Sequence, residues 1–353
     1  MVTAAGPRGG GTVTDTKATI ADVARAAGVS RAAVSKVLRS AYGVSDAMRT
    51  KVQAAIDELG YRPRVAARAM RGSSYILGIE IPNTANMFLD RVLRSLASAL
   101  VGTPYRVIIA PAGEDENSTK AIQELVDYQV DGILAIGANA SPDWLEEQGR
   151  MRPLVMLGRH EPSSSYDTIG DDDVLGTRLL MGHLHELGHR RIAHLSITTA
   201  NHPHMWHSSH AVRSRTYDAI MREFGLGEQA RTVLVTPTEE AAYQRTLVLL
   251  EEPNRPTAIF AGHDELALGV LRAVVEKGLS PADVSVVGYD DSSIASHPLV
   301  SLTTIRQSAD VIGSLVAQML LERIAGRTEA VHTVLTPELR VRRSTAPPLH
   351  SGT

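Results

Sequence analysis

The sequence predicts a small all-α head followed by an α/β body that contains two doubly wound parallel-sheet subdomains. Three observations predict this architecture. Apolar residues recur with helical spacing, between capping residues, up to about residue 60. From Tyr75 onward, strand-like apolar runs alternate with amphipathic segments of helix length, which is the pattern of βαβ units. The chain has 353 residues, 43% of them hydrophobic, so it is too long for one ordinary core and suits two or three.

The head is expected to contain three short helices. Thr19, Ser30 and Ser45 stand where N-caps are expected, and Gly28 and Gly60 end the first and third helices. An acidic residue follows Thr19 at the spacing of a capping box, and the second helix is expected to reach about residue 39. The lengths of the first two helices and the glycine in the turn between them are typical of a helix-turn-helix.

Charge is divided unevenly along the chain. Residues 17–73 contain eleven lysines and arginines against four acidic residues, a net charge of +7. Because the whole chain carries −3 and residues 1–16 are balanced, residues 74–353 carry −10. A basic head on an acidic body favours a polyanion as the partner of the head, and a solvated basic surface without function is the alternative.

The body is expected to form strands in two series, each followed by helices. In such folds ligands bind beyond the carboxyl ends of the strands, and two facing sheets create a cleft between them. A ligand is therefore expected in that cleft. The expected strands are residues 75–82, 105–110, 131–137 and 154–157 in the first series, and 191–196, 232–236, 258–261 and 284–289 in the second.

Several classes of protein are disfavoured by composition. The chain has no cysteine, which excludes disulfides, thiolate zinc sites and cysteine nucleophiles. No apolar run reaches the roughly 18 residues of a membrane span, and residues 1–16 lack the pattern of a signal peptide. We therefore expect a cytoplasmic protein without membrane contact, whose residues 1–16, rich in Gly, Ala and Thr, form a disordered tail.

The segments 19–30, 31–38 and 59–63 closely resemble the head of the lactose-repressor (LacI/GalR) family of transcriptional regulators. The resemblance continues through the body, for example at residues 184–192 and 286–291. It implies a periplasmic-binding-protein-like body, a homodimer, double-stranded operator DNA as partner, and a sugar or related metabolite as allosteric effector. It implies no cofactor and no enzymatic activity. The protein is thus expected to be a sequence-specific repressor acting on the nucleoid.

The resemblance also divides the chain. It implies a DNA-binding domain over residues 17–62, a hinge helix over 63–73 and an effector-binding domain over 74–345, with a tail over 346–353. Within the effector-binding domain, one subdomain is expected to hold about residues 74–171 and 302–330. The other is expected to hold about residues 172–301 and 331–345.

The DNA-contacting residues are carried over by position from the family pattern. Arg31 and Ala32 are placed at base edges, with Lys36 one turn further along the helix. An arginine there can bind guanine O6 and N7 together. In the hinge, Met70 stands where the family normally has a leucine that wedges into the minor groove, and Arg64 stands where an asparagine is common. The full expected set is Thr19, Ser30, Arg31, Ala32, Ser35, Lys36, Arg39, Ser45, Tyr61, Arg64, Ala67 and Met70.

The main effector-contacting residues follow from the same resemblance, whereas Trp206 is expected because its ring could stack on a pyranose face. Arg213 is expected to clamp effector oxygens and Asp290 to accept effector hydroxyls, a pairing suited to sugars and other polyols. His263 stands where the family has an asparagine, and Gly158 replaces an aspartate used by some sugar-binding members. The full expected set is Asn86, Phe88, Arg159, Trp206, Arg213, His263 and Asp290.

Residues 201–210 contain four histidines and a tryptophan. Three interpretations stay open: a loop at the rim of the cleft, direct contact with the effector, or metal binding through histidines at ligand-like spacing. The metal interpretation defines one rival function, a metal-dependent hydrolase. A solute-binding protein of a transporter is the other rival, against which the basic head and the missing signal peptide argue.

Overall fold

The computed structural model describes residues 18–38, 43–61, 73–82, 86–112, 118–161, 163–197 and 204–349. The chain divides into two compact units, Met1–Ser74 and Tyr75–Thr353. We refer to them as the head and the body. The division lies next to residue 74, where the effector-binding domain was expected to begin.

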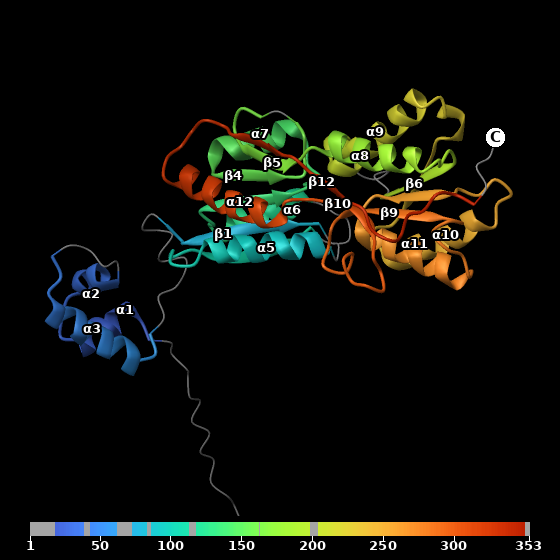
Figure 1. The fold of residues 1–353 in the computed structure, drawn as a ribbon. Coiled ribbons are helices and arrows are strands. Elements are labelled where there is room, and N and C mark those ends of the chain that lie inside the picture. The colour runs from blue at the N-terminus through green and yellow to red at the C-terminus, as the bar shows by residue number, and fades with distance from the viewer. Residues whose placement is uncertain are drawn as a thin grey trace, which may run out of the picture. The chain divides into compact units, whose positions relative to one another are not determined.

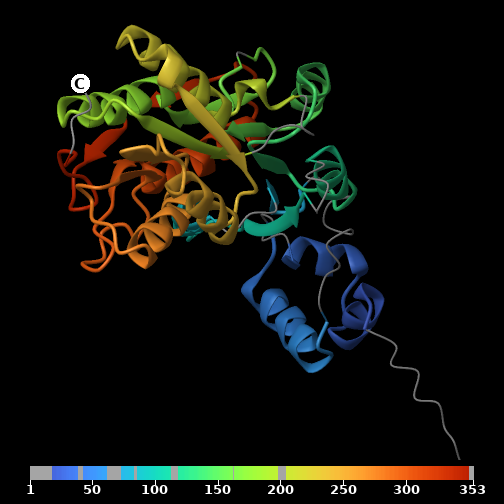
Figure 2. The same cartoon turned by 90° about the vertical axis from the view of Figure 1, so that its right-hand side faces the viewer.

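The head contains three helices, α1 (Ile20–Ala26), α2 (Arg31–Leu38) and α3 (Asp46–Glu58), seen in Figure 2. Each begins at an expected cap. The Asp22 amide donates to Thr19 Oγ1 and the Thr19 amide donates to Asp22 Oδ2, which completes the capping box. Ser30 and Ser45 accept the amides three residues further on, at 3.1 and 3.3 Å.

The three helices of the head pack around a small core. Its buried members include Val23 from α1, Val34 and Val37 from α2, and Val52 from α3. Gly28 has φ +67°, a left-handed conformation that glycine adopts without strain, and it ends α1 as expected. The predicted helix-turn-helix is confirmed.

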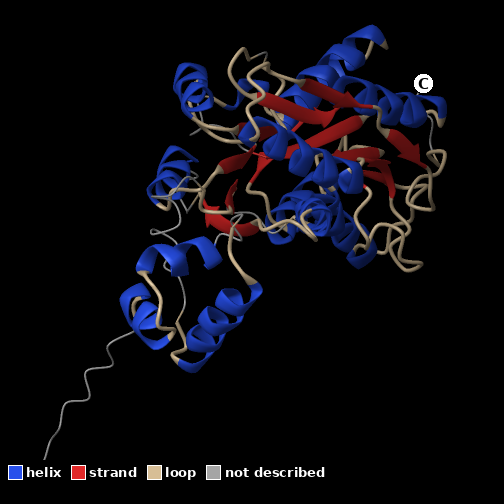
Figure 3. Cartoon of the chain, turned by 90° about the vertical axis from the view of Figure 1, so that its left-hand side faces the viewer, coloured by secondary structure: helices blue, strands red, loops and turns tan. Residues whose placement is uncertain are grey.

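The body contains two six-stranded sheets, drawn as red arrows in Figure 3. The interior strands over residues 132–136 and 258–261 are continuous apolar runs, as in parallel sheets covered on both faces. The first sheet has the order β11-β5-β4-β3-β1-β2, from β1 (Ile76–Ile81), β2 (Arg106–Pro111), β3 (Gly132–Ile136), β4 (Leu154–Leu157), β5 (Asp167–Asp171) and β11 (His332–Leu335). The second has the order β12-β10-β9-β8-β6-β7, from β6 (Ile192–Ile197), β7 (Arg231–Val235), β8 (Ala258–Ala261), β9 (Ser285–Asp290), β10 (Thr303–Arg306) and β12 (Glu338–Arg340).

Helices cover both faces of each sheet, and the two layered subdomains lie side by side in the body (Figure 1). The first sheet packs on α5 (Met87–Ala99) and α12 (Ala309–Ile324) on one face, and on α6 (Ser118–Asp127) and α7 (Pro142–Met151) on the other. The second packs on α10 (Glu239–Leu250) and α11 (Asp264–Glu276), and on α8 (Asp173–Glu186) and α9 (Ser209–Glu223). The short helices η1 (Met205–His207) and η2 (Gly227–Gln229) flank α9. The predicted fold class is confirmed.

The chain crosses between the subdomains three times, and two crossings differ from expectation. β10 pairs with β9 in the second sheet, although residues from 302 were assigned to the first subdomain. β11 pairs with β5 in the first sheet, although residues from 331 were assigned to the second. Both crossings therefore lie a few residues later. The apolar pattern of a short strand does not say which of two sheets it joins, because only the pairing partner decides this.

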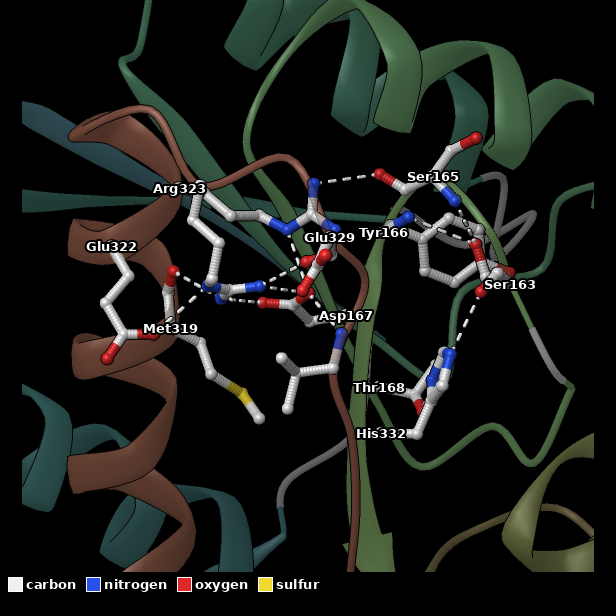
Figure 4. Close-up of polar contacts among 12 residues, drawn as sticks. Ser163, Ser165, Tyr166, Asp167, Thr168, Met319, Glu322, Arg323, Glu329 and His332 are labelled. Carbon is white, nitrogen blue, oxygen red and sulfur yellow. Dashed lines mark hydrogen bonds and ion pairs between the residues drawn. The ribbon is translucent and has the colours of Figure 1, made fainter.

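Buried ion pairs hold the segment between the second and third crossings against the first sheet. Asp167 at the start of β5 accepts hydrogen bonds from Arg323 of α12, from Arg327 and from the Val331 amide, as Figure 4 shows around Asp167 and Arg323. Arg323 also donates to the carbonyl of Ser165 at 2.9 Å. This network fastens α12 and the segment leading into β11 to the first sheet.

Candidate functional site

The head presents one polar face of α2 to solvent. Arg31, Ala32 and Lys36 are exposed, whereas Val34 and Val37 on the opposite face are buried in the core of the head. This face is free to contact a duplex, because the residues that hold α2 in place point the other way.

Three of the expected DNA-contacting residues of the head lie at helix starts. Thr19, Ser30 and Ser45 are exposed caps, so their neighbouring amides form helix N-termini that favour an anion. Ser35 and Tyr61 are partly buried, and Tyr61 packs against the core of the head. Arg39, Arg64, Ala67 and Met70 lie outside the described residues, as do the tail over 1–16 and most of the hinge.

The body contains a cavity where the carboxyl ends of the two sheets meet. Asp171, Ile197 and Asp290 are the last residues of β5, β6 and β9, and Gln307 follows β10 directly. Five of the seven expected effector residues line this cavity: Asn86, Phe88, Arg213, His263 and Asp290. Other polar lining comes from Ser118, Asn139, Asp171, Ser208, Ser209, His210 and Gln307, and apolar lining from Pro82, Leu89, Ile136, Leu157, Ile197, Met205 and Pro237.

Arg213 of α9 is held rigidly in the cavity wall. Its Nε donates to Asp173 Oδ1 and its Nη1 to the Gly262 carbonyl, both at 2.7 Å. Its guanidinium lies 3.5 Å from the centre of the Tyr289 ring, a cation–π contact. Burial alone would raise the pKa of Asp173, but Arg213 and His160 outweigh it and hold that pKa below its ordinary value. Arg213 is therefore an ion-paired cation with a fixed orientation.

Asp290 lines the same cavity and offers a carboxyl group where Arg213 offers a cation. Its backbone has φ 117°, an unusual conformation for a non-glycine residue, of the kind that clusters at binding sites. The Gln307 amide donates to Asp290 Oδ1. Burial raises the pKa of Asp290 to about 8, although the Arg213 cation favours the ionised form. Asp290 is thus a constrained acceptor for a donor group on a ligand.

Two histidines complete the polar wall. His210 and His263 contact each other edge to face, with ring centres 5.4 Å apart. Burial lowers the pKa of His263 to about 3 and also lowers that of His210. Both rings are therefore neutral near pH 7. The Nδ1 atom of each is buried and has no hydrogen-bond partner among the described residues.

A backbone bridge joins the two subdomains at one edge of the cavity. Arg159, after β4, pairs with Ser208 at the start of α9. The His160 amide donates to the His207 carbonyl at 3.0 Å, and the Ser209 amide to the Gly158 carbonyl at 3.2 Å. The His160 ring also contacts Asp173 Oδ2 at 2.7 Å. The bridge is thereby linked through Asp173 to Arg213 in the cavity.

The structure places Arg159 and Trp206 away from the lining. Arg159 is buried, donates to the carbonyls of Ala138 and Ala140, and pairs with Glu161, so it shapes the wall from behind. Trp206 is 64% exposed and lies beneath the guanidinium of Arg215. Neither is among the residues that line the cavity.

Residues 204–210 of the histidine-rich segment form η1 and the start of α9. Among the described residues no group of three or more His, Cys, Asp or Glu side chains is arranged to hold a metal ion. His202 lies outside them. None of the helices that the structure describes has the length and apolar character that a membrane crossing requires.

Comparisons with known proteins agree with both units. Residues 19–64 match the model of "Bacterial regulatory proteins, lacI family", and residues 181–345 match that of a "Periplasmic binding protein-like domain". The ribose operon repressor of Escherichia coli (strain K12) is 31% identical over 334 residues, which cover 93% of this chain and 99% of that protein. The chain belongs to the LacI family.

Other transcriptional regulators resemble between 77% and 94% of the chain. The transcriptional repressor PurR of Vibrio atlanticus (strain LGP32) is 31% identical, with 94% of this chain and all of that protein covered. The crystal structure of the lac repressor dimer bound to operator and the anti-inducer ONPF superposes with a TM-score of 0.79 at 27% identity, covering 94% of this chain and 100% of that chain. The crystal structure of a LacI-family regulator from Enterococcus faecium with bound ribose superposes with a TM-score of 0.67 at 27% identity. It covers 77% of this chain and 99% of that chain.

As a LacI-family member, the chain is a DNA-binding transcriptional regulator. Its cavity is also lined by polar residues outside the expected set, among them Asp171 and Gln307, and by His210, which belongs to the segment for which effector contact stayed open. Asp171 and Gln307 end or follow strands that the apolar pattern did not reveal. Once β5 and β10 are known, both residues can be identified as polar side chains at the end of a strand or directly after it.

Proposed function

We propose that this protein is a sequence-specific repressor whose hold on operator DNA is controlled by a sugar or related small polyol in the cavity of the body. One observation carries the proposal. A single chain combines an exposed Arg31–Ala32–Lys36 face on a helix-turn-helix with a buried cavity lined by Arg213, Asp290 and neutral histidines.

The head supplies the DNA contacts. In this proposal Arg31 and Ala32 face base edges and Lys36 lies beside them, while the helix-start residues Thr19, Ser30 and Ser45 contact phosphates. Ser35, Arg39 and Tyr61 add backbone contacts. The hinge over 63–73, with Arg64, Ala67 and Met70, enters the minor groove.

The cavity supplies the effector contacts. Asn86, Phe88, Arg213, His263 and Asp290 bind the effector, with Arg159 and Trp206 acting from outside the lining. The E. faecium relative with bound ribose and a cellobiose complex of the regulator CelR support a sugar as the ligand. Polar side chains that both donate and accept, next to apolar faces such as Phe88, suit a polyol ring.

We further propose that the protein works as a homodimer on nucleoid DNA in the cytoplasm, without cofactor or catalytic step. The lac repressor relative is a dimer on its operator, and two heads related by a two-fold axis match the symmetry of paired half-sites. Effector binding changes how the subdomains meet, and this alters the spacing of the paired hinges.

The test is operator selection from random DNA, followed by quantitative binding at moderate ionic strength. We expect Arg31→Ala to lose about 1–3 kcal/mol of discrimination at one base pair of each half-site. Lys36→Ala should weaken binding across sequences more evenly. Arg150→Ala, an exposed change on α7 of the body, is the control and should alter neither.

A chain lacking residues 1–73 should bind no operator but should still be stabilised against heat by an effector. A full chain that prefers no DNA sequence over random fragments, with or without sugars, would disprove the proposed function.

A further inference from the structure

The cavity holds more buried carboxyl groups than the cation in its wall can pair with. Asp171 and Asp290 both line it, and they are only 2% and 5% exposed. Among the described lining residues Arg213 is the one permanently cationic side chain, because His210 and His263 are kept neutral by burial. Two carboxyl groups therefore share one guanidinium.

That guanidinium is already paired with a third carboxylate. Arg213 Nε donates to Asp173 Oδ1, and Asp173 is buried directly behind the cavity wall. At Asp171 the two charges act in opposite directions: Asp173 raises the pKa of Asp171 and Arg213 lowers it. Arg213 and Asp173 thus form a nearly neutral pair, and little cationic charge remains for the two lining carboxyl groups.

Asp171 also has an oxygen that no group of the described residues satisfies. Its Oδ2 is buried and has no hydrogen-bond partner among the described residues. Its Oδ1 accepts one long bond of 3.4 Å from the Ser308 amide. A buried carboxylate oxygen without a donor is costly, so a group on the bound ligand is the natural donor.

We propose that the effector is a sugar or polyol that carries an ammonium group, and that Asp171 binds this group. The inference rests on the proposed function, because it takes the cavity as the effector site. Phe88, Leu157 and Ile197 then supply apolar surface for the carbon ring, while Asp290 and the two histidines bind hydroxyls.

Neutral and phosphorylated sugars fit the polar lining of the cavity less well. A neutral hydroxyl can donate to Asp171 Oδ2, but it supplies no positive charge to balance an ionised Asp171. A phosphorylated sugar adds a further anion beside the buried carboxyl groups. Without ligand, burial raises the pKa of Asp171 to about 7, so a proton holds the place that the ammonium group takes.

The experiment compares matched probes on the full chain by calorimetry at pH 7. The pairs are glucosamine and glucose, galactosamine and galactose, and mannosamine and mannose, with glucose 6-phosphate as an anionic probe. We expect at least one amino sugar to bind at least tenfold more tightly than its hydroxyl partner, and the phosphate to bind more weakly than glucose. If no pair favours the amine, because hydroxyl sugars bind equally well or because none binds, the proposal is overturned.

Asp171→Asn tests the assigned acceptor, because it keeps the shape and removes the charge. The preference for the amine should fall at least tenfold, and Asp143→Asn on the exposed start of α7 should leave it intact. The melting temperature of unliganded Asp171→Asn at pH 8 should equal or exceed that of the unchanged chain, which shows that the variant folds. A full amine preference in Asp171→Asn would contradict the assignment.

Operator selectivity measured on the same preparations separates the two proposals. If it is present while no pair favours the amine, only the ligand assignment fails. If it is absent, the proposed function fails.

Discussion

Asp167 and Asp171 are the two ends of β5, and they show how a neighbourhood decides what a buried carboxyl group does. Burial alone would raise the pKa of both. At Asp167 hydrogen bonds from Arg327, Val331 and Arg323 outweigh burial and lower the pKa. At Asp171 nothing comparable is present among the described residues, and burial raises the pKa to about 7. One aspartate is a structural anchor, and the other is available to a ligand.

Asp167→Asn should therefore be strongly destabilising. Removing the charge leaves Arg323 buried without its partner, and losses of about 3–5 kcal/mol are typical of this situation. The stabilisation from Asp167 is present above its ordinary pKa and is lost as pH falls through the lowered pKa of the folded state. Urea unfolding at pH 7 and pH 3 checks both points, and the difference between the two proteins should shrink at pH 3.

Glu223→Gln is the matched control, because the Arg178–Glu223 pair is half exposed. It should change stability little at either pH. Equal losses for the two substitutions would contradict the anchoring role of Asp167.

At individual positions, the resemblance carried prediction further than the chemistry of the residues alone. It led to Arg213 and Asp290, which line the cavity. The chemistry of the histidine-rich segment led to Trp206, whose ring lies outside the lining, because the ability of a ring to stack on a sugar does not fix which way the side chain turns. Asp171 was missed, since an aspartate among three consecutive aspartates gives no sign of which one is buried.

At the scale of elements, Gly313 makes a close contact between two helices of the body possible. This residue of α12 lies against α5, where an added Cβ would meet the Val92 carbonyl oxygen and the Leu96 amide nitrogen, the latter at 2.7 Å. Both are backbone atoms, so α5 cannot yield by turning a side chain. The two helices cover one face of the first sheet, and their separation sets how that face is filled.

Gly313→Ala should push α5 and α12 apart and destabilise the protein by about 1–3 kcal/mol. Gly182→Ala in α8 is the control, because nothing lies within 4 Å of its added Cβ. At position 182 the higher helix propensity of alanine should stabilise the folded protein by up to about 1 kcal/mol. Thermal unfolding of both variants measures the difference. Opposite signs are expected, and a neutral Gly313→Ala would show that the helices can separate at no cost.

Elements with local signals were predictable, and those defined by distant pairing were not. The capping residues gave the starts of α1, α2 and α3, and long apolar runs gave β1, β3 and β9. β5, β10, β11 and β12 are short and carry polar residues, so their apolar pattern is weak. Their place depends on hydrogen bonding to neighbours far away in the sequence, which no local pattern contains.

At the scale of the whole molecule, charge has different effects on DNA binding by the head and on ligand binding in the body. The head region carries +7 and the remainder −10, so association with DNA is driven by the head while the body opposes it. In contrast, the charged side chains that line the cavity of the body, Asp171, Arg213 and Asp290, are buried, so salt screens their charges little.

Raising the salt concentration from 50 to 200 mM should weaken operator binding at least about 100-fold, because phosphate contacts release counterions. Binding of a sugar to the same protein should change far less. Fluorescence anisotropy with labelled operator and calorimetry with the sugar measure the two slopes. Lys36→Ala should reduce the salt slope by about one for each head. Operator binding that ignores salt would contradict a phosphate-contacting head.

The late crossings of the chain have a consequence for biosynthesis. β11 completes one sheet and β12 completes the other, and only Pro337 and its neighbour separate them. The ribosome must therefore deliver residues 332–340 before both sheets have their outer strands. A chain that stops before His332 leaves β5 paired with β4 alone and β10 paired with β9 alone, so both subdomains of such a shortened product expose an unpaired strand edge.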